Sequence, residues 1–151
     1  MQIINYLLAS IISYLGLLAG AILIKIAPEE QKPGKKYFIL IKKIIFFLAI
    51  AFLLVYYKIN LIFSLLALLF AGIIVASRKL EKYEFAYFFL GIIFFLGSKI
   101  TGLFIIESVL VFLYGIPAAS LAFNAKKKNY RDIFLKNALF FAPVILLFFL
   151  F

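Results

Sequence analysis

The sequence predicts an all-α integral membrane protein, a polytopic bundle of six transmembrane helices. Hydrophobic residues make up 68% of the chain and the mean hydropathy is +1.20, whereas soluble domains contain roughly 45–50% apolar residues. A soluble globule of 151 residues has too little interior to bury so much apolar surface. Long apolar runs also alternate with short polar stretches throughout the chain. We therefore expect a single membrane domain that covers residues 1–151.

The first span is predicted at residues 2–26, because Gln2 to Ile24 carry no charge and a spanning helix needs about 20 apolar residues. The run is too long for the core of a signal peptide, so we expect it to be retained. Four small residues follow one side of this helix at spacings of four, three and four, namely Ala9, Ser13, Gly16 and Gly20. In lipid, small residues let two helix backbones approach closely. This face is predicted to pack against the protein's own helices or to dock another subunit.

A polar stretch, residues 27–36, separates the first two spans. Pro28 suits the first turn of a short helix, with Glu29 and Glu30 favoured at its positive end. Pro33 and Gly34 fit a tight turn, which places the second span at 37–57. The simplest interpretation is a solvated turn. The alternative is a contact with a lipid headgroup or a cytoplasmic partner, through Glu29, Glu30, Lys32, Lys35 and Lys36.

Four further spans follow from the remaining apolar runs, predicted at 59–77, 84–98, 103–124 and 133–151. The run 84–98 is short, and it crosses the membrane only if flanking residues extend it. Pro143 predicts a kink in the last span. Six spans place both termini on one side of the membrane. Of the sixteen basic residues, all but Lys58 and Lys99 lie in or beside the loops after spans one, three and five.

Because basic loops are retained in the cytoplasm, this asymmetry predicts that both termini face outward. We expect the protein in the cell membrane, of a prokaryote. Surface lysines and arginines attract anionic lipids, so anionic lipids at the cytoplasmic face are an expected partner. Nucleic acid is not, because three short basic loops offer no reading element.

Residue types that the chain lacks exclude several chemistries. There is no cysteine and no histidine, which removes thiol nucleophiles, Ser-His-Asp triads and the common zinc sites. Phosphate-binding loops and dinucleotide-binding glycine patterns are also absent. We therefore expect no catalytic residue, no metal site and no cofactor.

Glu107 is the acid placed furthest inside an apolar run. Ionisable residues within spans are costly and usually face a cavity or a partner, which makes them candidates for a functional site. Tyr114 lies at i+7 on the same helix face, and Lys99, Asn5 and Tyr6 are expected at a similar depth. Together they predict a small ion or ligand site. In the structural alternative, Glu107 pairs with Lys99 or is held protonated.

Three functions remain open from the sequence. The first is a non-enzymatic membrane subunit or scaffold, which assembles with itself or with other membrane proteins through faces such as the small-residue stripe. The second is a small-solute, ion or proton transporter or channel that uses Glu107. The third is a membrane enzyme that modifies lipid headgroups through Glu29 and Glu30 at the cytoplasmic face.

Overall fold

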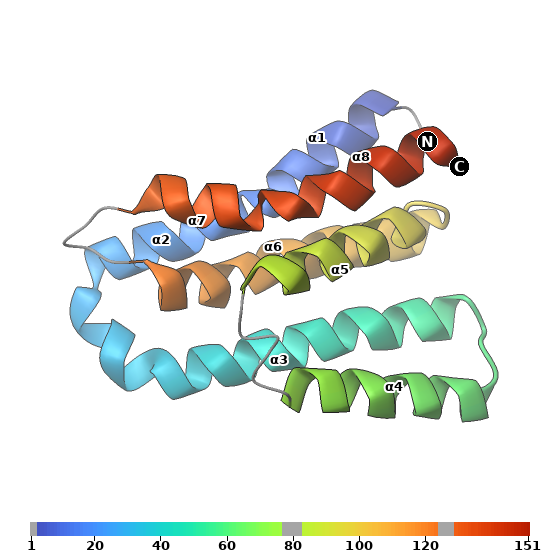
Figure 1. Ribbon diagram of the computed structural model, residues 1–151, viewed down its shortest axis with the longest axis horizontal. Coiled ribbons are helices and arrows are strands. Elements are labelled where there is room, and N and C mark those ends of the chain that lie inside the picture. The colour runs from blue at the N-terminus through green and yellow to red at the C-terminus, as the bar shows by residue number, and fades with distance from the viewer. Residues whose placement is uncertain (1–2, 77–82, 124–128) are drawn as a thin grey trace.

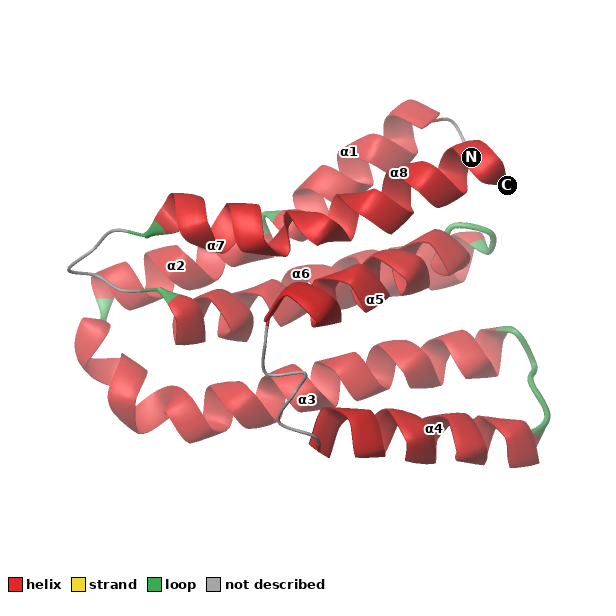
Figure 2. Ribbon diagram, in the orientation of Figure 1, coloured by secondary structure: helices red, strands yellow, loops and turns green. Residues whose placement is uncertain are grey.

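The structure is a computed structural model that describes residues 3–76, 83–123 and 129–151, with the side chains of these ranges except 73–76 and 83–84. The described residues are helical and include no strand (Figure 2). Four helical segments are long and apolar enough to cross a membrane. The predicted class, an all-α helix bundle suited to a membrane, is confirmed.

The described part of the chain runs back and forth in six helical passes (Figure 1). The elements in chain order are α1 (Ile3–Tyr14), α2 (Gly16–Ile26), the 3-10 turn η1 (Pro28–Glu30), α3 (Gln31–Tyr56), α4 (Leu61–Ala76), α5 (Tyr83–Gly97), α6 (Thr101–Ala122), α7 (Tyr130–Asn137), the 3-10 turn η3 (Ala138–Phe140) and α8 (Phe141–Leu150). Helices α1 and α2 form one pass interrupted at Leu15, whose amide donates to the carbonyls of both Ile11 and Ile12.

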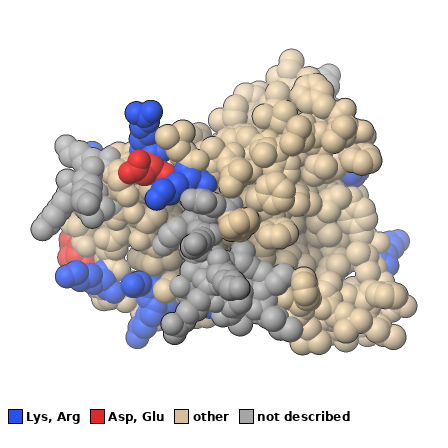
Figure 3. Space-filling view, in the orientation of Figure 1, with Lys and Arg blue, Asp and Glu red and all other residues tan. Residues whose placement is uncertain are grey.

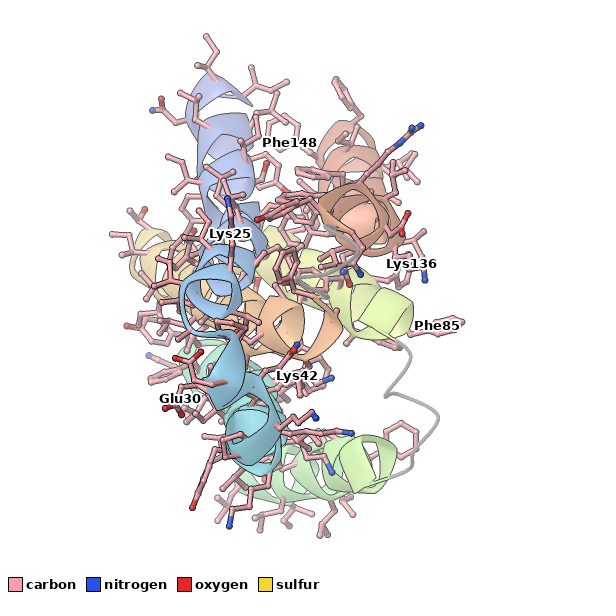
Figure 4. The ribbon with its side chains drawn as sticks, turned by 90° about the vertical axis from the view of Figure 1, so that its left-hand side faces the viewer. Lys25, Glu30, Lys42, Phe85, Lys136 and Phe148 are labelled. Carbon is pink, nitrogen blue, oxygen red and sulfur yellow. The ribbon has the colours of Figure 1, made fainter. Side chains whose placement is uncertain are left out.

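The passes stack as three layers of two (Figures 1 and 4). The α5–α6 hairpin forms the middle layer. The pass α1–α2 and the last pass, α7 to α8, cover one side of it, and the α3–α4 hairpin covers the other. Helix α6 packs against α1, α2, α3 and α5, and is therefore the most central element. The buried core follows it, from Leu103 to Phe123.

Helix α3 begins at Gln31, six residues before the predicted start at Tyr37. The predicted tight turn at Pro33 and Gly34 is wrong, because both residues lie in the first turn of this helix. Proline is tolerated there, since the first amides of a helix have no partner within the helix. The chain turns earlier, at Pro28–Glu30, where proline opens a 3-10 turn as expected.

The last pass bends where its proline predicts. Between α7 and α8 the helix tightens into η3, which ends three residues before Pro143. Proline has no amide hydrogen for the carbonyl four residues earlier, and its ring pushes that carbonyl away. Gly91 of α5 packs into this bend, because a Cβ at that position would lie 2.4 Å from the carbonyl oxygen of Phe140.

Two of the predicted spans are short helices. Helix α4 has 16 residues and α5 has 15, which gives each a length of roughly 22–24 Å at 1.5 Å per residue. The hydrocarbon core of a bilayer is about 30 Å thick. Helix α5 is shorter than this thickness, but other helices surround its inward face, which is buried from Ala86 to Phe95. Helix α4 is different, since it packs mainly on α3 and exposes most of its described side chains.

The two ends of the bundle differ in charge. Both termini lie at one end (Figure 1), together with the turns that hold Lys58 and Lys99. Most described basic side chains gather at the other end (Figure 3). Viewed from that end, Glu30 and Lys136 lie on opposite flanks of the bundle (Figure 4). The arrangement has the form that positive-inside sorting requires. Which end faces the cytoplasm stays a prediction.

Candidate functional site

Glu107 lies on the inner face of α6, two turns from the start of that helix. Its side chain is 0% exposed, and neither carboxyl oxygen has a hydrogen-bond partner. The stem packs on α5, since a Cβ added to Gly97 would lie 2.9 Å from the Glu107 Cγ. Glycine at position 97 therefore leaves the space that the carboxyl side chain occupies.

Lys99 does not neutralise this carboxyl group in the structure. Its ammonium nitrogen lies 4.7 Å from the centre of the Phe95 ring and donates to the backbone oxygen of Phe151 at 3.3 Å. The side chain is exposed in the turn between α5 and α6. Of the structural explanations for Glu107, pairing with Lys99 is thus absent from the structure. The other remains, because burial without a partner favours the uncharged carboxylic acid.

The other residues predicted for this site do not form one pocket with Glu107. Tyr6 is fully buried, donates to the carbonyl of Val144 at 3.0 Å and stacks on Phe148 at 4.8 Å between ring centroids. It also stacks on Phe104, one turn before Glu107, at 6.1 Å. Asn5 is exposed on α1. Tyr114 lies two turns further along α6, in a separate cluster.

That second cluster consists of Tyr14, Tyr87 and Tyr114, contributed by α1, α5 and α6. The Tyr87 ring packs edge-on against the rings of Tyr114 at 5.4 Å and Tyr14 at 5.9 Å. The Tyr14 hydroxyl donates to the carbonyl of Phe134, whereas the hydroxyl of Tyr87 is buried with no hydrogen-bond partner. Sequence reasoning missed Tyr87. In the sequence it lies only three residues after Glu84, at the start of the predicted fourth span, where it resembles the interfacial tyrosines that concentrate at membrane surfaces.

A third residue with an unpartnered buried polar atom lies on α7. The side-chain nitrogen of Asn137 donates to the carbonyl of Ile133 at 2.8 Å, but its Oδ1 accepts no hydrogen bond. Buried polar groups are nearly always partnered in native proteins, so each exception needs an explanation. Of the three exceptions, Glu107 and Tyr87 both lie in the middle layer, whereas Asn137 lies on α7.

The small-residue stripe is used inside the chain. A Cβ on Gly16 would lie 2.0 Å from the carbonyl oxygen of Phe112, and one on Gly20 would lie 2.1 Å from that of Ile116. On α6, a Cβ added to Gly115 would likewise lie 2.6 Å from the backbone of Gly16. The α2 and α6 backbones are therefore in direct contact. This face is covered by α6 and cannot serve as the docking face for another subunit.

Two other stripe residues complete the packing of this pass. Ser13 is buried and Ala9 is half-buried against the core. Further along the α2–α6 contact, the Ser120 hydroxyl donates to the carbonyl of Gly20 at 3.3 Å. Of the two interpretations left open by the sequence, the structure contains internal packing of the stripe against α6.

The charged residues of the polar stretch after the first pass are exposed. Glu29, Glu30, Lys32, Lys35 and Lys36 all project into the surroundings. Gln31 instead reaches α6, where its side-chain nitrogen donates to the carbonyls of Ser120 at 2.8 Å and Phe123 at 2.7 Å. These carbonyls end α6 and have no partner within the helix. Gln31 therefore caps α6 from another helix, a role that sequence reasoning did not predict.

A groove on the surface between α3 and α6, with a volume of about 300 Å³, is entirely apolar. Its lining residues are Phe38, Ile41, Ile45, Leu113, Ile116 and Pro117. It suits a lipid chain and offers no polar group that would fix a solute. Among the described residues no group of three or more acidic side chains gathers as a metal site would require.

A scan against protein-family models and searches of the curated proteins and of the solved structures find no match. The function is therefore argued from the site itself. Its central feature is a carboxyl group in the middle layer of an apolar bundle, buried and unpartnered.

Proposed function

We propose that the protein carries protons or a small cation across the membrane, with Glu107 as the group that binds them. The observation that supports this is the complete burial of an unpartnered carboxyl group. Leaving such a group unsatisfied costs roughly 1–3 kcal/mol, and more if it is charged. A side chain that only filled space would be apolar. Intramembrane carboxyl groups typically belong to ion pathways and proton relays.

The test is flux in liposomes that contain the purified protein. A pH-sensitive dye enclosed in the vesicles reports proton entry, while a potassium gradient with valinomycin sets the membrane potential. Glu107→Gln keeps the size of the side chain and removes its ability to ionise, so we expect flux to fall at least tenfold. Glu29→Gln is the matched control, because Glu29 is exposed in η1, and it should leave flux unchanged.

Sodium and potassium are assayed in the same vesicles with ion-selective dyes. If the wild-type protein conducts none of these ions above the level of empty liposomes, the transport proposal is wrong. It is equally wrong if Glu107→Gln conducts as well as the wild type while remaining folded.

A second candidate function is a membrane subunit or scaffold, and α4 favours it. This helix packs mainly on α3, and its outer side chains, such as Ile62 and Leu66, are 67% and 57% exposed. We expect a partner helix, from a second copy or another membrane protein, to cover this face. This face of α4 becomes the candidate interface in place of the small-residue stripe, which α6 already covers.

The subunit proposal is tested by native mass in mild detergent. Leu66→Trp should break an oligomer or release a co-purifying partner. Ile12→Trp, at an α1 residue that is 60% exposed, should not. A monomer with no partner, unchanged by either substitution, would remove the support for this candidate. Binding of anionic lipid by the basic end is proposed with both functions, since it needs only the lysines there.

A further inference from the structure

The α5–α6 hairpin carries two of the three residues with unpartnered buried polar atoms, Glu107 and Tyr87, along one interface. The helices are antiparallel, and Gly97 of α5 packs on Glu107 of α6. At the other end of the same interface, Tyr87 of α5 packs on Tyr114 of α6. Glu107 and Tyr114 are seven residues apart, which is about 10 Å along the helix. The interface therefore has one unpartnered carboxyl group, that of Glu107, near the end with the termini and a pair of tyrosines deeper in the bundle.

Between Glu107 and the two tyrosines, the fully buried side chains of both helices are apolar. Leu90 and Phe94 lie between Tyr87 and Gly97 on α5, and Val111 lies between Glu107 and Tyr114 on α6, each 0% exposed. We refer to Leu90, Phe94 and Val111 as the apolar plug. Apolar constrictions between polar segments gate several channels, because water leaves them when they narrow and returns when they widen.

The positions of Glu107 and Tyr87 are informative because an apolar residue of similar size could replace either one without leaving a polar group unsatisfied. Phenylalanine at position 87 would keep the ring contacts with Tyr14 and Tyr114 and would leave no hydroxyl unsatisfied. Methionine at 107 would fill the same space without a carboxyl group. Glu107 and Tyr87 both lie next to the plug. The helices that carry them also bury many residues that leave no polar atom without a hydrogen-bond partner. A common role for Glu107 and Tyr87 explains why both lie on this interface.

We propose that protons pass along the α5–α6 interface between Glu107 and Tyr87, and that the apolar plug closes this route in the conformation described. The inference rests on the proposed transport function and specifies its substrate and path. A proton fits better than a metal cation because both Glu107 oxygens are inaccessible. A carboxyl group and a phenol hydroxyl both exchange protons. Other ionisable groups around the interface are Tyr6 and Tyr14 from α1, Tyr56 and Tyr57 at the end of α3, Tyr114 from α6 and Lys99 in the connecting turn.

The experiment widens the plug by truncating one of its side chains and measures proton flux in the liposome assay. Leu90→Ala removes bulk between Glu107 and the Tyr87–Tyr114 pair, so it should raise proton flux at least fivefold above wild type. The matched control is Leu17→Ala, an equal truncation at a residue that is also 0% exposed but lies on α2, and its flux should stay within twofold of wild type. Adding Glu107→Gln to Leu90→Ala should return flux to background. Tyr87→Phe should lower it severalfold.

The outcomes separate this inference from the proposed function. If the wild type conducts through Glu107 but Leu90→Ala conducts no more than Leu17→Ala, the plug is refuted and the function stands. If Leu90→Ala opens a flux that Glu107→Gln does not abolish, the route through Glu107 is refuted. If neither the wild type nor Leu90→Ala conducts, both proposals fail.

A second measurement covers the case in which Leu90→Ala does not fold. The chain has no cysteine, so a single Leu90→Cys substitution can be probed with a charged, water-soluble thiol reagent. We expect slow labelling in liposomes, which a proton gradient accelerates, because the plug must admit water when it opens. Leu66→Cys, on the exposed face of α4, should not respond to the gradient. No labelling of Leu90→Cys under any gradient would overturn the inference.

Discussion

The α2–α6 contact predicts a large effect for the smallest possible substitution. In Gly16→Ala, the new methyl carbon would lie 2.0 Å from the carbonyl oxygen of Phe112. Carbon–oxygen contacts between helices are normally about 3.3 Å or longer, so the two backbones must separate by about 1.3 Å. The atom that is met belongs to a helix backbone and cannot rotate away. Gly115 of α6, which also packs on the backbone of Gly16, would lose this contact at the same time.

The expected loss of stability follows from this displacement. A radial gap of 0.5–1 Å already removes a quarter to a half of the dispersion attraction between facing atoms, and overpacked sites cost typically 1–3 kcal/mol. We take the upper end of this range, about 3 kcal/mol, as the cost of the clash, since the backbone must move. Alanine gains about 1 kcal/mol over glycine as a helix former. The net loss for Gly16→Ala is therefore about 2 kcal/mol.

Gly72→Ala is the matched control, because a Cβ at Gly72 meets nothing within 4 Å. This variant receives the same gain in helix propensity without the clash, and should be more stable than wild type by up to about 1 kcal/mol. The two alanine variants should thus differ by about 3 kcal/mol, more than a hundredfold in the folding equilibrium.

The assay is unfolding by SDS in mixed micelles, followed by the near-ultraviolet circular dichroism of the packed tyrosines. Helix content would be a poor signal, because helices persist in SDS when their packing is lost. The midpoint should fall for Gly16→Ala and hold or rise for Gly72→Ala. Equal midpoints for the two variants would refute the direct backbone contact between α2 and α6.

Three further substitutions test polar side chains within the bundle. Glu107→Met should raise the free energy of unfolding by about 1–3 kcal/mol, because it removes an unsatisfied buried group at similar volume; a loss of stability would mean that the carboxyl group has a structural partner. Gln31→Leu should lower it by about 1–3 kcal/mol through two lost hydrogen bonds, whereas Lys32→Ala at the exposed neighbouring position should change it by less than about 0.5 kcal/mol. Tyr6→Phe keeps the stacked rings and loses one buried hydrogen bond, so it should cost about 1 kcal/mol; Tyr57→Phe, which loses an exposed hydrogen bond, should cost less, and equal costs would contradict the difference in burial. All three are measured in the SDS titration described above.

The sequence by itself determined the class of the protein, an all-α bundle with helices apolar enough to cross a membrane. Hydropathy and loop charge are summed along a continuous segment, so they can be read without knowing which segments meet. The same local reading indicated the proline-opened turn at Pro28, the bend before Pro143 and the small-residue face of the first pass. It failed at Pro33, because proline is compatible with both a turn and the first turn of a helix, and local sequence does not distinguish them.

The tertiary structure decided which residues meet. That Gly16 packs on Phe112, that Gln31 caps α6 and that Tyr87 joins Tyr14 and Tyr114 are contacts between distant parts of the chain. In lipid, an apolar face gains little by choosing a protein neighbour over an acyl chain, so packing fit rather than hydrophobicity selects the partner. The fit depends on the relative rotation of the helices, which no single segment encodes. For the same reason the sequence could place Glu107 within a span, but only the fold leaves it without Lys99 and opposite Gly97.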